Sequence, residues 1–475
     1  MAAPLAEAGP AARRKVVCIG FMGAGKSTAA QSAAQALGTA HVDVDSVIEE
    51  RLGKPISRVF AEDGEAKFRA TEEEVTLELL ASPGARVLAL GGGAIGHERV
   101  RAALSEHVVV WLDVGLDIAW SRCQGSDRPL ARERPEFERL FHQREPLYAG
   151  LADVTVPAER SHRMEPILAA YQNVPHDTKL LWAVTAGNPG ADYPVYVGAG
   201  LLNEHGFWPE AVDGRRFLVT DGAVGRLYGD QLQPLSGRVA IMPGEQSKTV
   251  AHAEIVWTEL ARGGMTRRDV VVALGGGVVG DLAGFCAATY QRGVRYVQVP
   301  TTLVAQVDSA YGGKTGVDLA EAKNYVGAFH QPSAVITDVD TLKTLPDAER
   351  AAGYAEVLKT ALIAGGDLWE RVRDDAGSRP ATDRGLIAAC ALTKLRIVAR
   401  DERDAGIRQV LNLGHTVGHA IETVTGYAAY RHGEAVALGL LAALRLSGQD
   451  ELRAETEQLL KTNGLPTRLE HADPD

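Results

Sequence analysis

The chain has 475 residues, of which 45% are hydrophobic and 23% charged, and its formal net charge is −11. This length indicates about three domains, and no apolar run approaches the roughly 18 residues that cross a bilayer. The acidic balance argues against a nucleic-acid-binding surface, which normally needs a concentrated basic face. Four scattered cysteines without CxxC spacing indicate a reducing compartment. We therefore expect a cytoplasmic protein with neither nucleic acid nor membrane as partner.

The first part of the chain predicts an α/β domain with a parallel sheet over residues 14–170, preceded by a flexible N-terminus at 1–13. The β-branched run "KVVCIGF" is followed by a glycine turn and the alanine-rich "KSTAAQSAAQALG", which indicates a strand, a turn and a helix. Further strands are predicted at "ARVLALGGG" and "HVVVWLDV", separated by helical segments such as 72–80. The pattern fades over 151–179, so we expect a linker at 171–179.

A second α/β domain is predicted over residues 180–345. Its strand-like runs include "YPVYVGAGLL", "RRFLVTDGAV", "GRVAIMPG", "RDVVVALGGG" and "VRYVQVPTT". After Leu345 the chain becomes rich in alanine and leucine, which predicts an all-helical domain over 346–475.

The segment "GFMGAGKST", residues 20–28, fits the phosphate-binding pattern GxxxxGK[ST] between a predicted strand and a predicted helix. Glycines let backbone N–H groups turn toward phosphates, and the helix N-terminus favours negative charge. We expect Lys26 to reach the β- and γ-phosphates of ATP and Ser27 to hold Mg²⁺. The predicted nucleotide-binding residues are Gly23, Ala24, Gly25, Lys26, Ser27 and Thr28.

Acidic and basic residues that follow this loop suggest what is phosphorylated. "HVDVDSVIEE" places Asp43 and Asp45 two apart, so we expect them on one face of a strand end, where they could position a magnesium water and a substrate hydroxyl. Taken alone, the pair could equally be solvated turn residues. Later motifs contribute Arg69, Gly92, Gly93, Arg128 and Arg144.

In order and spacing, the P-loop, DxD, "FRATE", "GGGA", "RPL" and "REPLY" resemble shikimate kinase over roughly residues 14–170. The resemblance implies Mg²⁺ near Ser27 and Asp43, and a mobile lid that supplies Arg128 to the transferring phosphoryl group. It implies that Asp45 orients the 3-hydroxyl of shikimate. It also implies that Arg69 and Arg144, the two clamp arginines, bind the carboxylate of shikimate through bidentate contacts. The implied shikimate-binding residues are Asp45, Arg69, Gly92, Gly93 and Arg144.

The last third of the chain carries "GYAEVLKTA", "NLGHTVGHAIE" and "YRHGEAVALG". His415 and His419 lie four apart on a predicted helix and therefore share a face. Such a pair alone is usually structural. Together, Glu356, His415 and His432 would give three protein ligands from three helical segments and leave positions open for substrate oxygens, as in a catalytic zinc site.

Two glycine octapeptides stand out, "ALGGGAIG" from Ala89 and "ALGGGVVG" from Ala273. Their flanks share no further pattern, so we interpret them as two separate strand-end turns where a side chain would collide with a ligand. The second turn would let the backbone approach a pyrophosphate, although it departs from the GxGxxG fingerprint and is weak evidence for a dinucleotide alone.

An ordered set of motifs from about residue 180 onward resembles 3-dehydroquinate synthase, a sugar-phosphate cyclase: "GEQSK", "GGGVVGD", "TYQRGV", "PTTLVAQVDSAYGGKTGVD", "AKNYVGAFHQP", "TLKTLP", "AEVLK" and "NLGHTVGH". The resemblance implies zinc, or cobalt, at Glu356, His415 and His432. It implies NAD contacts from Asp221, Glu245, Lys248, Gly277, Asp281, Thr301, Thr302, Lys314, Lys323 and Thr344. It implies a substrate pocket that includes Asp308, Lys314, Lys323, Asn324, Lys359, Lys394, Arg408, Asn412 and His419.

The same resemblance implies a homodimer in which Arg292 reaches the substrate phosphate of the partner subunit. The implied reaction converts 3-deoxy-arabino-heptulosonate 7-phosphate to 3-dehydroquinate with release of phosphate, and Asp308, Lys314, Lys359 and His419 are its expected catalytic residues. We also expect the chain to lack the family's C-terminal segment beyond "GLPTRLEHADPD", and hence to be a weakened synthase.

The sequence thus predicts a bifunctional shikimate-pathway enzyme, and three alternatives remain open. The synthase half could be a non-catalytic scaffold for an active kinase, or a cyclase that makes an aminocyclitol precursor. The folds could also serve a gluconate-type kinase joined to a glycerol-dehydrogenase-like enzyme. Paired carboxylate clamps such as Arg69 with Arg144 argue against the last alternative, because neutral polyols do not need them.

Overall fold

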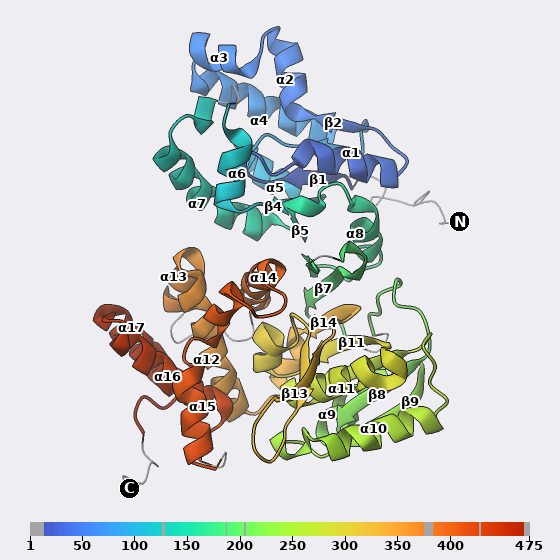
Figure 1. Cartoon of the computed structure of the whole chain (residues 1–475). Helices are drawn as coiled ribbons and strands as arrows, with labels where there is room; N and C mark the ends of the chain where they lie inside the picture. Colours follow the sequence, from blue (N-terminus) through green and yellow to red (C-terminus); the bar gives the residue numbers. More distant parts are fainter. Residues whose placement is uncertain are drawn as a thin grey trace. The chain divides into compact units, whose positions relative to one another are not determined.

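The computed structural model describes residues 14–125, 129–186, 188–203, 206–374, 383–426 and 429–469. The chain divides into two compact units, the first comprising Met1–Val174 and Lys179–Trp182 and the second Pro175–Thr178 and Ala183–Asp475. Figure 1 shows both, coloured along the sequence. None of the helices in the described ranges combines the length and the apolar character needed to cross a membrane.

The first unit is built on a parallel sheet with strand order β2-β3-β1-β4-β5-β6. Short β-branched runs form its centre, and all four residues of β1 are buried, as expected for a parallel strand covered on both faces. The strands are β1 (Val16–Ile19), β2 (His41–Asp43), β3 (Val87–Ala89), β4 (Val108–Asp113), β5 (Val154–Pro157) and β6 (Lys179–Ala183).

Helices alternate with these strands, as the sequence predicts. Helix α1 buries four alanines, and their small side chains let it pack closely against the sheet. The helices are α1 (Lys26–Ala36), α2 (Val44–Leu52), α3 (Ile56–Glu62), α4 (Glu65–Ala81), α5 (Glu98–Leu104), α6 (Leu116–Cys123), α7 (Arg134–Leu151) and α8 (Met164–Ala170). Strand β5 and helix α8 lie where the sequence pattern fades, because β5 has only four residues and ends in proline.

The second unit contains a parallel sheet of order β7-β14-β11-β10-β8-β9. Its strands are β7 (Tyr193–Gly198), β8 (Arg216–Asp221), β9 (Leu235–Ile241), β10 (Val270–Gly275), β11 (Arg295–Pro300) and β14 (Ala334–Asp338). An antiparallel pair, β12 (Lys314–Val317) and β13 (Val326–Phe329), lies beside α11. The helices of this part are α9 (Gly222–Tyr228), α10 (Val250–Arg262) and α11 (Gly277–Thr289).

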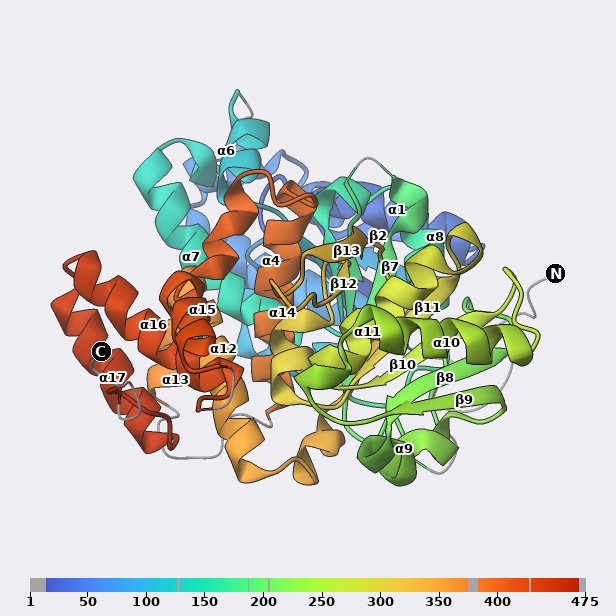
Figure 2. The same ribbon diagram turned by 60° about the horizontal axis from the view of Figure 1, so that its bottom comes forward.

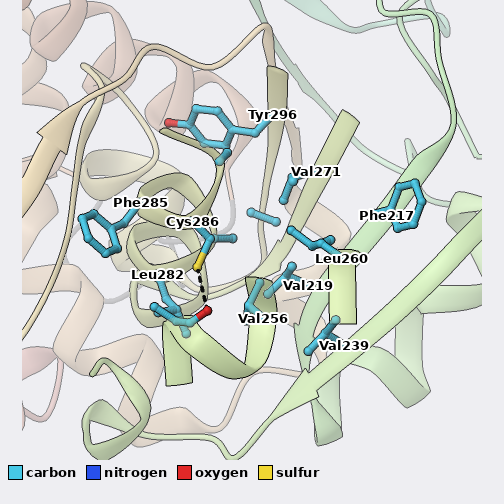
Figure 3. Close-up of a cluster of buried hydrophobic side chains, with 14 of the residues drawn as sticks. Phe217, Val219, Val239, Val256, Leu260, Val271, Leu282, Phe285, Cys286 and Tyr296 are labelled. Atoms are coloured by element: carbon cyan, nitrogen blue, oxygen red, sulfur yellow. Dashed lines mark hydrogen bonds between the residues drawn. The ribbon is translucent and has the colours of Figure 1, made fainter. Parts of the chain in front are cut away.

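A hydrophobic core joins this sheet to α10 and α11, and Figure 3 shows part of it. Val219 and Val271 from the strands meet Val256 and Leu260 from α10. The Cys286 thiol of α11 lies 3.8 Å from the carbonyl oxygen of Ala253. This packing holds the strand ends and the helix N-termini in fixed relation.

The rest of the second unit is helical, which confirms the predicted fold class. Helices α12, α15, α16 and α17 lie side by side (Figures 1 and 2). The helices are α12 (Asp347–Ala364), α13 (Gly366–Asp374), α14 (Arg384–Arg400), α15 (His415–Val424), α16 (His432–Leu446) and α17 (Asp450–Thr462). The exact domain boundaries drawn from the sequence stay predictions.

Candidate active sites

The P-loop connects the end of β1 to the start of α1. Gly23 and Gly25 have φ angles of 78° and 87°, in the left-handed region that glycine adopts without strain. The ammonium group of Lys26 curls back and donates a hydrogen bond to the carbonyl oxygen of Phe21 at 3.2 Å. The loop therefore has the backbone shape of a phosphate cradle, with a cation at its rim.

Ser27 and Asp43 meet beside this loop. The Ser27 hydroxyl donates a hydrogen bond of 2.5 Å to Asp43 Oδ2, while Asp43 Oδ1 caps α2 by accepting from the Asp45 backbone N–H at 3.1 Å. The expectation that Asp43 and Asp45 share a strand face is wrong, because β2 ends at Asp43 and Asp45 lies in the first turn of α2. A hydroxyl and a carboxylate in contact next to a phosphate cradle fit a magnesium ion and its waters.

A cavity of about 280 Å³ lies nearby, and Arg69, Gly93 and Arg144 are among the residues that line it. The carbonyl oxygen of Gly92 accepts hydrogen bonds from Arg144 Nη1 at 3.1 Å and from the Tyr148 hydroxyl at 2.6 Å. Asp45 lies against the same glycine turn, since a Cβ on Gly91 would be 2.7 Å from its Oδ1. The structure thus brings together the predicted shikimate-binding residues, which come from α2, α4, α7 and the turn after β3.

The two clamp arginines differ electrostatically. Arg69 pairs with the buried carboxylate of Glu72 at 2.6 Å and with Glu65 at 3.0 Å. Burial opposes its charge, but these carboxylates outweigh burial and raise the pKa of Arg69, whereas burial lowers the pKa of Arg144. No sequence prediction assigned roles to Glu72 or Tyr148, although both end quoted motifs. Arg128 lies outside the described residues.

The predicted NAD residues cluster at the carboxyl ends of neighbouring strands, where α/β sheets usually bind ligands. Asp221 ends β8 and caps α9 by accepting from the backbone N–H groups of Ala223 and Val224. Gly277 begins α11 after β10, Thr301 and Thr302 follow β11, and Thr344 follows the turn after β14.

Polar groups at this edge suit a dinucleotide. The buried hydroxyl of Thr301 has no hydrogen-bond partner among the described residues. A Cβ on Gly276 would approach the Thr302 methyl to 2.9 Å, so the backbone here is closely surrounded. The Thr301 hydroxyl is therefore available to a ligand, and it lies beside a glycine turn at a helix N-terminus. This arrangement fits the pyrophosphate of NAD.

Lys248 connects several of these residues. Its ammonium lies 2.6 Å from Asp281 Oδ2 and donates to Asn324 Oδ1 at 2.5 Å. Burial opposes its charge, yet Asp281 and Glu245 outweigh burial and raise the pKa of Lys248. Lys323 lies 3.7 Å from Glu245. The predicted cofactor and substrate lysines are therefore held by acidic partners.

Glu356 of α12, His415 of α15 and His432 of α16 present ligand atoms within 4.8 Å of one another. Glu356 Oε1 lies 3.6 Å from His415 Nε2 and 3.4 Å from His432 Nε2. Glu356 is fully buried, and neither of its oxygens accepts a well-oriented hydrogen bond from a described residue. A buried carboxylate facing two imidazoles fits a divalent cation such as zinc.

Charged side chains form a network that begins at Glu356. Lys359 lies 2.5 Å from Glu356 Oε2 and 2.8 Å from Asp308 Oδ2. Lys394 donates to the Asp308 backbone oxygen at 2.8 Å and also to its carboxylate. Burial raises the pKa of Asp308, but Lys359 and Lys394 outweigh burial and hold it well below its usual value. Asp308 lies in a short π-helical turn, Ala305–Ser309, a feature frequent at functional sites.

Two of the remaining predicted substrate residues, Arg408 and His419, lie near this network. Arg408 is 1% exposed and donates to the carbonyl oxygens of Glu402 and Gly312, and Lys314 pairs with Asp404. Asn412 and His419 are exposed, and the His419 ring lies 5.3 Å from that of His415. Arg292 is exposed and precedes β11, so it lies at the amino ends of the parallel strands, whereas the predicted NAD residues lie at the carboxyl ends.

Sequence reasoning missed Glu422, which is buried beside this group. Its carboxylate lies 3.4 Å from His432 Nδ1 and 3.2 Å from Lys323 Nζ. The available signal was its spacing, because Glu422 follows His415 by seven residues and His419 by three and therefore shares their helix face.

Comparisons with known proteins agree with this geometry. The family model "Shikimate kinase" matches residues 22–173, "3-dehydroquinate synthase N-terminal" matches 238–352, and "3-dehydroquinate synthase C-terminal" matches 353–475. The 3-dehydroquinate synthase of Halorhodospira halophila is 47% identical over 288 residues, 58% of this chain and 81% of the relative. That of Symbiobacterium thermophilum is 46% identical over 307 residues, 59% of this chain and 84% of the relative.

Two solved structures resemble the second unit. The 2-epi-5-epi-valiolone synthase of Streptomyces hygroscopicus, with NAD⁺ and Zn²⁺ bound, is 27% identical with a TM-score of 0.56 and covers 62% of this chain and 86% of its own. A 2-deoxy-scyllo-inosose synthase complexed with carbaglucose-6-phosphate, NAD⁺ and Co²⁺ is 25% identical with a TM-score of 0.55 and covers 62% and 84%.

These matches correct one expectation and establish the family. The model of the C-terminal domain extends over 353–475, so the expectation that the chain lacks the family's C-terminal segment is wrong: helices α12 to α17 form that domain. The reason given for a weakened synthase is thereby removed. The chain belongs to the 3-dehydroquinate synthase family and also carries a shikimate kinase domain, which makes it a bifunctional enzyme of the shikimate pathway.

Proposed function

We propose that the kinase unit transfers the γ-phosphoryl group of ATP to the 3-hydroxyl of shikimate with the residues around the P-loop. The backbone N–H groups from Gly23 to Thr28 bind the phosphates, and Lys26 neutralises charge on the group in transfer. Ser27 and Asp43 would hold Mg²⁺, which would supply positive charge to offset the negative charge of the phosphates. The contact between the Ser27 hydroxyl and Asp43 supports this role.

Shikimate then occupies the 280 Å³ cavity, with its carboxylate toward Arg69 and Arg144. Asp45 lies against the same glycine turn as these arginines and orients the 3-hydroxyl, accepting its proton as the phosphoryl group arrives. Arg128 stays a predicted lid residue that neutralises charge once the site closes.

In the synthase unit, the doubly anionic heptulosonate phosphate lies between the strand ends and the helical part. Arg408, Lys314 and Lys394 bind its phosphate and carboxylate, and Asn324, Asn412 and His419 contact its hydroxyls. A cation held by Glu356, His415 and His432 would polarise the C5 hydroxyl. NAD bound at the strand ends would supply reversible oxidation at C5, which acidifies the neighbouring C–H. The Lys359–Asp308 pair next to the metal ligands is placed to hold the proton that the C5 hydroxyl loses.

Arg292 has a separate role in this proposal. It is exposed at the amino ends of the parallel strands, away from the predicted NAD residues at the carboxyl ends. In this proposal it therefore binds the substrate phosphate in the partner subunit of a homodimer. The cytoplasmic location expected from the sequence stays a prediction.

One observation carries the synthase proposal: ligand atoms of Glu356, His415 and His432, drawn from three helices, converge within 4.8 Å beside the Lys359–Asp308 pair. The test gives the purified protein shikimate with ATP, and separately the heptulosonate phosphate with NAD and zinc, and measures ADP and inorganic phosphate. Lys26→Met should abolish only ADP formation, and Glu356→Gln only phosphate release. Absence of ATP consumption with shikimate would reject the kinase roles, and a fully active Glu356→Gln variant would reject the metal role.

A further inference from the structure

Glu422 is a buried carboxylate that the proposed chemistry does not use. It lies on α15, the helix that carries His415, and only 3% of its surface is exposed. An ionised side chain at such a position needs specific partners, because burying an unpaired charge is strongly destabilising. Its partners therefore show what the residue does.

One partner is His432, whose ring lies between two carboxylates. Nδ1 is 3.4 Å from Glu422 Oε2, and Nε2 is 3.4 Å from Glu356 Oε1. A proton on Nδ1 that faces Glu422 leaves the Nε2 lone pair directed at Glu356, where a metal would lie. Outer carboxylates that bind the second nitrogen of a ligand histidine fix its tautomer and ring orientation in this way.

The other partner is Lys323, which precedes β13. Its ammonium lies 3.2 Å from Glu422 Oε1 and 3.7 Å from Glu245 Oε1. Glu245 follows β9 and belongs to the predicted NAD set, so the contact links α15 to the predicted cofactor residues. Each oxygen of Glu422 thus contacts a different predicted site residue.

We propose that Glu422 is a positioning residue that orients His432 toward the metal with one oxygen and holds Lys323 beside Glu245, a predicted NAD residue, with the other. The inference rests on the proposed metal role of Glu356, His415 and His432. Glu422 could instead be a ligand, because His419, Glu422 and His432 also present ligand atoms within 4.8 Å. An ion there would face a carboxylate that already pairs with Lys323, whereas neither oxygen of Glu356 accepts a well-oriented hydrogen bond from a described residue, so the contacts favour positioning.

Glu422→Ala, Glu422→Gln and Lys323→Met test the inference, with Val424→Ala as the control, because Val424 lies on the same helix and is 82% exposed. The first measurement is the zinc dissociation constant, obtained by competition with a chromophoric chelator. We expect Glu422→Ala to weaken zinc binding by roughly 10–100-fold. Glu422→Gln should lose less, because an amide oxygen can still accept from Nδ1–H. Lys323→Met should keep the zinc affinity of the control.

NAD titration supplies the second measurement. Both Glu422 variants and Lys323→Met should weaken NAD binding relative to Val424→Ala, because each removes the charged partner that holds this lysine or the lysine itself. At saturating Co²⁺, the visible spectrum of the Co²⁺ protein should be the same in Glu422→Ala as in wild type. A spectrum that shows loss of a ligand would overturn the positioning role and assign Glu422 to the metal.

The failure of this inference differs from failure of the proposed function. If the wild-type protein binds no stoichiometric zinc, the metal role itself is wrong. If the wild type binds zinc and Glu422→Ala binds it equally well, only the positioning role is wrong. Should Glu422→Ala not fold, Glu422→Gln decides: zinc and NAD affinities that both equal those of Val424→Ala overturn the inference.

Discussion

The guanidinium of Arg69 lies so close to the Cα atom of Gly93 that a Cβ at this position would collide with it. Arg69 is held from the other side by Glu72 and Glu65. At Gly92, one residue earlier, a Cβ would meet its nearest neighbour, the Gly20 carbonyl oxygen, at an ordinary 3.5 Å. Two adjacent glycines of one turn therefore make different steric demands.

Gly93→Ala should therefore displace the Arg69 guanidinium and raise the KM for shikimate by about tenfold or more, which corresponds to about 1.4 kcal/mol of lost binding. Steady-state kinase assays measure this effect, and phosphate release by the synthase unit is an internal control. Gly92→Ala is the matched variant and should change the KM less. Equal effects of the two substitutions would contradict the steric role of Gly93.

Asp43→Asn should weaken magnesium use by the kinase. Asp43 accepts a hydrogen bond from the Ser27 hydroxyl, and replacing a partner of a metal ligand typically costs 10–100-fold in metal affinity. We expect the Mg²⁺ concentration for half-maximal activity to rise by about that factor, with little change in the KM for shikimate. Titration of activity with Mg²⁺ at saturating ATP measures it, and an unchanged titration curve would argue against the assignment.

Removal of tightly bound metal should separate the two activities. Dialysis against a strong chelator, followed by exchange into a buffer with Mg²⁺, should leave shikimate phosphorylation intact and abolish phosphate release from the heptulosonate phosphate. Added Zn²⁺ or Co²⁺ should restore phosphate release, because Glu356, His415 and His432 form a site for such an ion. Full synthase activity in metal-free protein would refute the zinc role.

Asp269, in the turn before β10, should make the second unit sensitive to acid. Burial opposes its charge, but hydrogen bonds from Arg215 and Thr266 outweigh burial and lower the pKa of Asp269 to about 2 from 3.8. A lowered pKa stabilises the fold above pH 3.8, here by about 2 kcal/mol, and this stabilisation is lost as the pH falls toward 2. Asp269→Asn should lower protection of β10 amides from hydrogen exchange at pH 7, and the difference from wild type should shrink between pH 4 and 2. A difference that is independent of pH would contradict this origin.

Mixing two inactive synthase variants should restore activity if Arg292 acts in a partner subunit. In a dimer of Arg292→Ala with Glu356→Gln, one site has both intact residues and the other has neither. Random subunit exchange makes half of the dimers mixed, so about a quarter of wild-type phosphate release is expected. Either variant alone stays inactive as the control, and no recovery in demonstrably mixed dimers would place Arg292 in its own subunit's site.

Much of the fold and part of both sites could be predicted from the sequence because their signals are local. The P-loop glycines lie between a β-branched run and an alanine-rich helix, and four-residue spacing places His415 and His419 on one face. Parallel strands buried on both faces appear as continuous apolar runs, so β8, β10 and β11 were easy to recognise.

Other features depend on tertiary packing and leave little local trace. Asp45 was expected on a strand, but a three-residue strand cannot be distinguished from the helix that directly follows it. The contacts of Asp308 with Lys359 and Lys394 join three segments separated by up to 86 positions. Glu422 belongs to a quoted motif, yet its function becomes visible only when Lys323 and His432 are seen on either side of its carboxylate.

Arg408 is a buried cation among the residues of the proposed substrate site. Its guanidinium is almost fully shielded from water and donates to carbonyl oxygens, and its Nε finds no acceptor among the described residues. Burial lowers the pKa of Arg408, as expected when a cation loses hydration. In the proposed substrate site, an oxyanion of the substrate would supply the acceptor that Nε lacks. Inorganic phosphate, the released product, should bind at the same position and therefore inhibit the synthase in competition with the substrate.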